Sequence, residues 1–353
     1  LNIVPSCIQS NDRESPFQRV LLQWPISICS GHLTTRAVGI IIMAKTTLTR
    51  RDIIRAGAAA AIPFASSHGA RASDDQQPVI GISTLGFNKH SNQQLAEELA
   101  REGFRTIQLF LSQTDSNYWK YNGRTDVSSL TAGRCKAIAD AYKNAGITIH
   151  SIGVYTNLIH PDAAERTANL AYFEAMMRAG SSMGCSTFIT EAGHYEPETP
   201  ERIPLHFQEQ VWNQMVATGK ELAAMAERNG AKVLLEPFFR GFLASAKRMR
   251  LFIEDIGSPR IRALLDPANL LEINDLEEMF AQLAPYIDCL HAKDRKLHVD
   301  RGVPAGQGDL DYRKFVSLAA KHTPKARFIL EYVGPKDYRD ALAHLKAALA
   351  AGA

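Results

Sequence analysis

The stretch AKVLLEPFFRGFLASAKRMRLFIEDIGSPRIRALLD, residues 231–266, decides the fold class. An apolar run at 231–236 is followed by an amphipathic segment and then by a second apolar run at 261–266. Short apolar runs separated by longer amphipathic segments are typical of parallel strands joined by helices. Each run also ends in an acidic residue that is followed by proline. The stretch therefore predicts a strand–helix–strand unit with a carboxylate at the end of each strand.

The same alternation continues from Val79 almost to the C-terminus. Gly103, Gly146, Gly184 and Gly230 each stand just before an apolar run, where the end of a helix favours a left-handed residue. Eight such units predict an α/β protein with a single closed (β/α)8 barrel, or TIM barrel. An open doubly wound sheet is the alternative, but no Gly-x-Gly-x-x-Gly motif follows the first strand. The expected strands are 79–84, 104–111, 147–154, 186–191, 231–236, 261–266, 287–291 and 327–332.

Composition and charge narrow the class of protein. The chain has 353 residues, of which 45% are hydrophobic and 22% charged, so collagen-like, disordered and disulfide-framework proteins are excluded. No run of 18 apolar residues occurs, and we expect no membrane-spanning helix or stable membrane anchor. Residues 1–72 hold 8 Lys and Arg against 3 Asp and Glu, whereas residues 73–353 hold 32 against 34. The nearly neutral main part argues against a nucleic-acid partner. Its three cysteines contain no CxxC pair, which excludes a thiolate zinc site.

The basic N-terminal part contains the elements of an export signal. TRRDIIR at Thr49–Arg55 resembles the twin-arginine motif. An apolar, Ala-rich run at 56–65 and the small-x-small cleavage site Ala70-Arg71-Ala72 follow it in order. The alternative is an amphipathic helix that begins with two arginines. We expect export through the twin-arginine translocase, which places the mature protein in the periplasm or the medium.

These features divide the chain into three parts. Residues 43–72 are expected to form the cleavable signal peptide, with Met43 as the natural start. Residues 1–42 begin with Leu and show no clear periodicity, and we expect them to be an unstructured upstream extension from a wrongly assigned start. Residues 73–353 are expected to form the barrel.

The fifth to eighth predicted strands each end in a side chain that can bind metal. Glu236, Asp266, His291 and Glu331 all follow apolar strands, and the C-terminal ends of barrel strands meet at one rim. One such residue alone would more often cap a loop, but four in succession favour a shared site. Three carboxylates packed together without a cation would repel one another. The set predicts one divalent metal, Mn²⁺, with Mg²⁺, Co²⁺ and Zn²⁺ as alternatives.

The motifs around these residues resemble those of the xylose isomerase-like TIM barrels. They are LLEPF at Glu236, LLDPAN at Asp266, HAKD at His291 and ILEY at Glu331. The segment GQGDLD at 306–311 resembles the family's glycine turn between strand 7 and helix 7. The resemblance covers nearly the whole chain beyond the signal. It implies that the four side chains bind a single divalent metal and that the two glutamates face each other across the substrate.

The resemblance implies sugar chemistry through an enediolate. A metal would polarise a carbonyl, and Glu236 and Glu331 would act as catalytic base and acid on the neighbouring carbon. The expected protein is therefore a sugar or keto-sugar isomerase or epimerase with an unphosphorylated small-molecule carbohydrate as substrate. Loss of a β-substituent from the same enediolate would instead give a 3-keto-glycoside lyase or hydratase, or an enzyme like inosose dehydratase. This alternative stays open.

Further residues near the strand ends are candidates for binding the sugar. Asn269 stands where the ketose 3-epimerases have a substrate-contacting His, and Gln108 stands where many members have an acidic residue. Those epimerases also have an Arg soon after the strand-7 His, and Lys293, Arg295 and Arg301 are candidates for this role in a longer loop. The predicted substrate-binding residues are Glu191, Asn269, Lys293, Arg301, Phe87 and Trp119, with Tyr118, Tyr155, Phe238 and Phe239 as further aromatic candidates.

Two histidines and two other functions remain open. His150 lies inside a predicted strand, which favours a core histidine, whereas His194 follows Glu191 in a loop and could serve either purpose. An AP endonuclease would need three metals and further histidines that the second strand does not offer. A non-catalytic sugar-binding barrel would keep the four ligands as relics. Assembly into a homo-oligomer is a further expectation.

Overall fold

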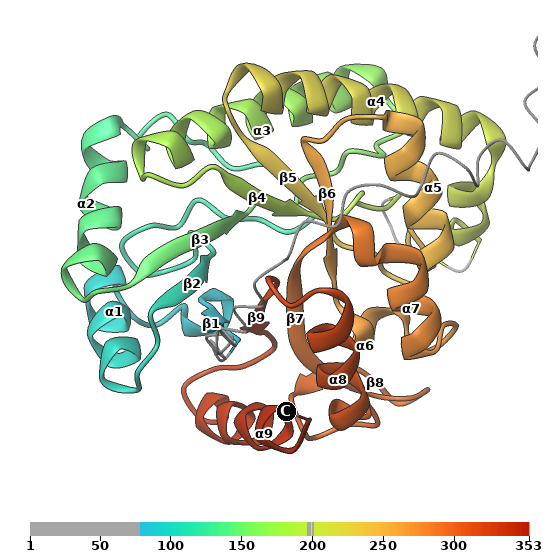
Figure 1. Ribbon diagram of the computed structural model, residues 1–353. Coiled ribbons are helices and arrows are strands. Elements are labelled where there is room, and N and C mark those ends of the chain that lie inside the picture. The colour runs from blue at the N-terminus through green and yellow to red at the C-terminus, as the bar shows by residue number, and fades with distance from the viewer. Residues whose placement is uncertain (1–77, 196–198, 200, 353) are drawn as a thin grey trace, which may run out of the picture. The chain divides into compact units, whose positions relative to one another are not determined.

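The computed structural model describes residues 78–195, 199 and 201–352 of the chain, and these form a closed parallel barrel. Each barrel strand pairs with its neighbour in sequence, and the ring closes through β6 with β7, β7 with β9, and β9 with β1. The predicted fold class is confirmed (Figure 1). The barrel strands are β1 (Ile80–Ser83), β2 (Thr106–Leu109), β3 (Thr148–Gly153), β4 (Thr187–Thr190), β5 (Lys232–Leu235), β6 (Ile261–Leu265), β7 (Ile287–Lys296) and β9 (Arg327–Leu330).

Helices surround the barrel on its outside (Figure 1). Most α-helices begin at a side-chain N-cap: Ser91 forms a capping box with Gln94, and Asp162, Asp275 and Asp311 accept backbone N–H groups in the same way. The α-helices are α1 (Asn92–Arg101), α2 (Ala132–Asn144), α3 (Ala163–Ser182), α4 (Glu209–Arg228), α5 (Ala246–Ile256), α6 (Pro267–Leu270), α7 (Leu276–Leu283), α8 (Tyr312–His322) and α9 (Tyr338–Gly352). Three 3₁₀-helices are also described: η1 (Leu85–Phe87), η2 (Ile203–Phe207) and η3 (Ala284–Tyr286).

Among the described helices, none combines the length and the apolar character that a membrane span requires. The predicted export signal, its cleavage site and the boundary at residue 42 lie outside the described residues. They stay predictions.

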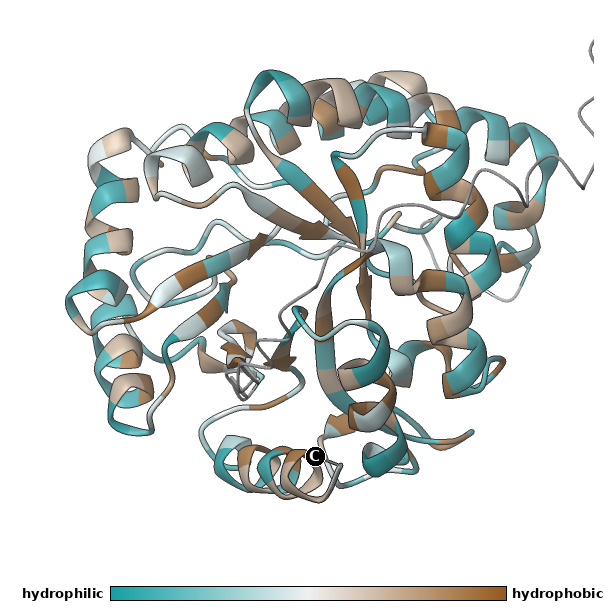
Figure 2. Ribbon diagram, viewed as in Figure 1, coloured by the Kyte–Doolittle hydropathy of each residue, from teal (hydrophilic) through white to brown (hydrophobic). Residues whose placement is uncertain are grey.

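The barrel strands bury their two faces in two separate apolar layers. A small cluster contains Ile189, Leu234, Leu264, Cys289 and Ile329, one residue from each of five strands. On β5, β6 and β9 the residues on either side pack in the larger cluster with the helices, as Val233 and Leu235 do on β5. Because side chains alternate along a strand, the small cluster is the barrel interior and the large one is the layer between strands and helices. Figure 2 shows that the strands consist largely of hydrophobic residues.

Because side chains alternate along the strands, the next inward-facing residue towards the C-terminal mouth of the barrel stands two positions after each interior residue. Two positions after Leu234, Leu264, Cys289 and Ile329 stand Glu236, Asp266, His291 and Glu331. Because side chains alternate along a strand, the barrel interior has an apolar layer directly beneath these four polar side chains.

The region after His291 differs from the prediction. Lys293 and Arg295 were expected in a long loop, but β7 continues through Lys296 and pairs with the antiparallel β8 (Asp300–Pro304), which carries Arg301. The expectation of a loop is wrong because the chain forms a hairpin that extends beyond the barrel rim. The glycine turn at 306–311 consequently follows β8.

Asp294 holds this turn in place. Its side chain is fully buried, and its oxygens accept hydrogen bonds from the backbone N–H groups of Arg295, Gly306 and Leu310 at 2.8, 3.2 and 3.0 Å. A Cβ on Gly308 would collide with the Asp294 carboxylate and with the backbone oxygen of Arg295. The turn therefore tolerates only glycine at this position.

Replacing Gly308 with Ala should destabilise the protein by about 1–3 kcal/mol, because the added methyl group must displace packed backbone. Chemical denaturation measures the change in the free energy of unfolding. Gly133→Ala is the matched control, since a Cβ there meets only the Thr131 hydroxyl at 3.9 Å on an exposed helix. A Gly308→Ala variant as stable as the control variant would contradict this account of the turn.

Candidate metal centre at the barrel mouth

Four polar side chains from four strands converge at the C-terminal end of the barrel. One ligand atom from each of Glu236, Asp266, His291 and Glu331 lies within 4.8 Å of the others, and all four residues are buried. Glu236 and Glu331 directly follow β5 and β9, Asp266 is the N-cap of α6, and His291 lies on β7. The predicted convergence of these residues on one place is confirmed.

His291 points one ring nitrogen into this group and the other away from it. Its Nδ1 lies 3.3 Å from Glu236 Oε1, 3.4 Å from Glu331 Oε2 and 3.8 Å from Asp266 Oδ2. Nδ1 nevertheless has no hydrogen-bond partner among the described residues. Its Nε2 lies 2.7 Å from Oε1 of Gln108 on β2. Gln108 thus stabilises the tautomer in which Nε2 carries the proton and Nδ1 presents a lone pair to the carboxylates.

Glu236 is held at both oxygens. The Tyr155 hydroxyl donates to Oε2 at 2.6 Å, and the Asn269 side-chain amide donates to Oε1 at 2.9 Å. Burial raises the pKa of Glu236, and the neighbouring His291 opposes this rise. Asn269 also accepts a hydrogen bond from Lys293 Nζ at 2.8 Å, so it links this glutamate to the lysine.

Lys293 is a buried cation at the edge of the group. Its Nζ lies 2.9 Å from Asp266 Oδ2 and 3.4 Å from Glu331 Oε2. Burial alone would raise the pKa of Asp266, but Lys293 and His291 lower it to about 2. The ring of Tyr332 covers Nζ at 4.3 Å from its centroid, and Tyr332 adopts a left-handed φ of 55°. Non-glycine residues rarely adopt this conformation.

The donor set fits a divalent cation. Three carboxylate oxygens and one imidazole nitrogen are ligands that Mn²⁺, Mg²⁺, Co²⁺ and Zn²⁺ all accept. Three buried carboxylates carry more negative charge than Lys293 balances, and they raise the pKa of His291 well above its usual value against the effect of burial. A divalent ion beside a neutral His291 would make the group electrically neutral. Nδ1 of His291, buried without a hydrogen bond among the described residues, would supply the nitrogen ligand.

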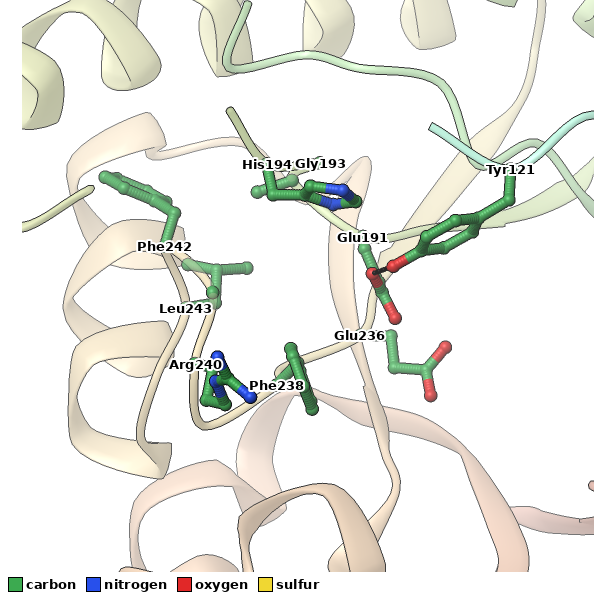
Figure 3. A pocket seen from close by; sticks show the side chains of 11 residues that line it. Tyr121, Glu191, Gly193, His194, Glu236, Phe238, Arg240, Phe242 and Leu243 are labelled. Atoms are coloured by element: carbon green, nitrogen blue, oxygen red, sulfur yellow. Dashed lines mark hydrogen bonds between the residues drawn. The ribbon is translucent and has the colours of Figure 1, made fainter. Parts of the chain in front are cut away.

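A hollow beside the group holds several further polar side chains (Figure 3). We call it the Glu191 hollow, and Glu191, Glu236, His194, Phe238 and Arg240 are among its lining residues. The Tyr121 hydroxyl donates to Glu191 Oε2 at 2.8 Å. Burial and the charge of Glu236 raise the pKa of Glu191 to about 8. Glu191 therefore lies in the mouth, beside Glu236, and tends to hold a proton near neutral pH.

The remaining predicted residues lie in several places. Phe87 is fully buried in the layer between strands and helices, against His90 and Tyr338, and so does not face the mouth as expected. The reason is that η1 turns the chain outward after β1, which leaves Leu85 against the interior cluster and Phe87 behind it. Trp119 packs against the interior cluster and contacts Phe110 edge to face.

Two of the three basic candidates after His291 lie beside aromatic rings of the β5–α5 segment. The guanidinium of Arg301 lies 5.9 Å from the centroid of Phe238, and that of Arg295 lies 4.8 Å from the centroid of Phe239. Arg295 is buried and also pairs with Glu272 at 3.0 Å. Of these three residues, Lys293 contacts the carboxylates of Asp266 and Glu331.

His150 lies near the start of β3, at the opposite end of the barrel from the four candidate metal ligands. Its Nδ1 lies 3.1 Å from the Ser151 hydroxyl. Burial, with Arg327 and Lys232 nearby, lowers its pKa to about 4.

Two residues of the candidate metal centre, Gln108 and Tyr155 through its hydroxyl, were not predicted from the sequence. Gln108 is fully buried, and its contact with His291 joins residues 183 positions apart. A lone amide in the apolar run FRTIQLFL was the available signal, since a buried amide needs a polar partner. Tyr155 follows β3 and was considered only as an aromatic surface. Nothing in its local sequence indicates that its hydroxyl reaches Glu236.

Replacing Gln108 with Leu should weaken divalent-metal binding by about 10–100-fold, because the His291 ring loses the acceptor that fixes its tautomer. The dissociation constant is measured by competition with a chromophoric chelator. Gln108→Glu is the matched control, since it keeps an acceptor oxygen facing Nε2. Equal metal affinity in the Leu variant and the unmodified protein would show that Gln108 does not orient this ligand.

Comparison with known proteins identifies the family. The model of the xylose isomerase-like TIM barrel family matches residues 96–348. The chain belongs to this family. A search of curated proteins found no match.

Solved structures share the fold at low identity. A xylose isomerase-like TIM barrel protein from Mycobacterium smegmatis in complex with magnesium is 19% identical with a TM-score of 0.58, covering 79% of this chain and 98% of its own. A 3-keto-D-glucoside 4-epimerase from E. coli is 17% identical with a TM-score of 0.60, covering 76% and 99%. A D-psicose 3-epimerase is 17% identical with a TM-score of 0.58, covering 78% and 99%. At these identities the likeness concerns the fold.

Proposed function

We propose that this xylose isomerase-like barrel is a divalent-metal-dependent isomerase or epimerase of a keto-sugar, with Mn²⁺ as its metal. The observation that carries the proposal is the buried convergence of Glu236, Asp266, His291 and Glu331. Two proteins of the same fold are named as sugar epimerases, which supports the reaction class by analogy of fold.

The two glutamates are suited to proton transfer on a bound sugar. A divalent ion, when bound, would act as a Lewis acid on the substrate carbonyl. Oε1 of Glu331 accepts no hydrogen bond within the described chain, so Glu331 can take the proton from the carbon beside the carbonyl. Lys293, 3.4 Å from its other oxygen, keeps Glu331 charged for this step. Glu236, held by Tyr155 and Asn269, can return a proton.

A specific observation favours a lyase as the second candidate. Elimination breaks the bond between the β-carbon and its oxygen substituent after the α-proton has been removed, and the departing oxygen needs a proton. Glu191 faces the same hollow as Glu236, and its pKa of about 8 keeps it protonated near neutral pH. It could therefore donate that proton. Within the described ranges one group of metal-ligating side chains is found, which does not suit a three-metal endonuclease.

The test is metal-dependent exchange of carbon-bound hydrogen. Chelator-treated protein is reloaded with Mn²⁺, Mg²⁺, Co²⁺ or Zn²⁺ and mixed in deuterated buffer with free ketoses and 3-keto-glycosides. NMR should show deuterium entering beside the carbonyl only in reloaded samples. An epimer as product supports the first candidate, whereas an ultraviolet-absorbing enone supports the lyase. Absence of exchange with every metal and sugar would overturn both.

We also propose that the protein is exported by the twin-arginine route and that its mature form begins after Ala72. The ordered motif, apolar run and cleavage site in residues 49–72 support this. N-terminal sequencing of protein recovered from the periplasm should begin at Ser73. Retention of the uncleaved chain in the cytoplasm, with both arginines intact, would contradict export.

A further inference from the structure

A second polar region lies at the opposite end of the barrel from the candidate metal ligands. The strands begin there, and a cavity of about 370 Å³ opens among their first residues. We call it the lower well. Its polar lining comes from β3, β4, β5, β7, β9 and the residue pair before β9: His150, Thr187, Lys232, Asp288, Arg327 and Lys325.

The lower well is part of the barrel interior. Leu234, a member of the interior cluster, lines it from above. Lys232, two positions earlier on β5, and Arg327, two positions before Ile329 on β9, face the same interior side because side chains alternate along strands. The basic side chains therefore lie directly beneath the apolar layer of the barrel.

Positive charge in the lower well exceeds negative charge. Lys232, Lys325 and Arg327 line it, and Asp288 is the carboxylate among the lining residues. Asp288 is already engaged twice: it pairs with Lys232, and its Oδ1 lies 3.2 Å from Arg262. It therefore leaves no negative charge for the other two cations.

Arg327 has no side-chain partner in the described part of the chain. It is half-buried at the start of β9, and its guanidinium forms no hydrogen bond or ion pair with any residue that the structure describes. Lys325, exposed at the rim two positions earlier, likewise has no partner there. The positive charge also affects the pKa of His150. Burial lowers this pKa, and the nearby Arg327 and Lys232 lower it further, to about 4. A half-buried guanidinium that faces a cavity whose lining carboxylate, Asp288, is already paired is a site for an anion.

We propose that the lower well binds a small oxyanion of the phosphate or sulfate type, held by Arg327 and Lys325. The guanidinium offers parallel N–H donors that match two oxygens of such an anion, and the lysine adds a second charge. The Thr187 hydroxyl and the Lys232 ammonium line the same cavity and can donate further hydrogen bonds. The site is independent of the proposed reaction, since it lies at the other end of the strands.

The test uses the full chain and inorganic phosphate. Isothermal titration at constant ionic strength should show one phosphate site, and millimolar phosphate should raise the melting temperature more than chloride does. Arg327→Gln should weaken phosphate binding by about 10-fold or more, since charge-assisted hydrogen bonds to an oxyanion are lost. Lys325→Gln, at an exposed position where folding is not at risk, should weaken binding several-fold. Lys220→Gln, on the exposed face of α4, should leave it unchanged.

Two outcomes would overturn the proposal. One is equal phosphate affinity in the unmodified protein, Arg327→Gln and Lys325→Gln. A rise in melting temperature with phosphate would then reflect the general exclusion of phosphate from protein surfaces. The other is a calorimetric titration that shows no phosphate binding to the unmodified chain.

Discussion

A Glu331→Gln variant should lose about 10²–10⁴-fold in the rate of carbon–hydrogen exchange, because an amide cannot take up the substrate proton. Gln keeps the size of the side chain and an oxygen facing His291 and Lys293, so the keto-sugar should still bind. The expected pattern is a fall in turnover with a nearly unchanged substrate dissociation constant, which is the sign of an interaction made only in the transition state. Exchange is followed by NMR and binding by calorimetry.

The design must separate loss of the base from loss of the metal. Glu331 is also a candidate ligand, so the metal content of the variant is determined before each assay. The exposed Glu221→Gln on α4 is the matched control and should exchange at the unmodified rate. A Glu331→Gln variant that retains metal and exchanges within about threefold of the unmodified rate would show that another group is the base. If the unmodified protein binds the sugar and never exchanges it, the chain is a sugar-binding barrel.

A Lys293→Met variant should lose about 3–5 kcal/mol of stability when metal-free, because the buried carboxylates of Asp266 and Glu331 lose the lysine charge that faces them. Lys293 is 3% exposed and lies within 3.4 Å of both Asp266 and Glu331. Methionine fills a similar volume but supplies no charge. Urea denaturation in the presence of a chelator measures the change.

The double variant Lys293→Met with Asp266→Asn is the control for this interpretation. Removing the carboxylate that the lysine contacts most closely, at 2.9 Å, should restore part of the lost stability. A divalent metal should also stabilise the single variant, since it returns positive charge to the group. If Lys293→Met unfolds with a free energy within about 1 kcal/mol of the unmodified protein, Lys293 does not balance these carboxylates.

The four candidate ligands could be predicted because a parallel barrel brings every strand's C-terminal end to one rim. The location of an acidic or histidine residue after an apolar run, as in LLEP or ILEY, can therefore be predicted as the barrel rim, although its contacts cannot. Strand positions followed from apolar runs for the same reason. Boundaries were less exact, as for the strand expected at 104–111, which is confined to Thr106–Leu109.

Contacts between distant strands could not be predicted in this way. The pairing of Gln108 with His291 depends on side-chain rotamers across the barrel, and the local sequence of either residue does not encode it. The β7–β8 hairpin was missed because DRKLHVDRG carries more charge than a typical strand. Phe87 was misplaced because a single short turn decides which layer a ring after β1 enters.

The interior of the barrel has one more consequence, which concerns insertions and deletions. On β5, β6 and β9 the inward positions read Lys232-Leu234-Glu236, Arg262-Leu264-Asp266 and Arg327-Ile329-Glu331. A one-residue insertion between the cation and the acid of such a strand would turn one of the two outward into the helices and leave an apolar side chain in its place. Homologues of this protein should therefore vary in length only beyond the strands, where the hairpin after His291 and the segments above the rim can lengthen and reshape the entrance to the barrel mouth.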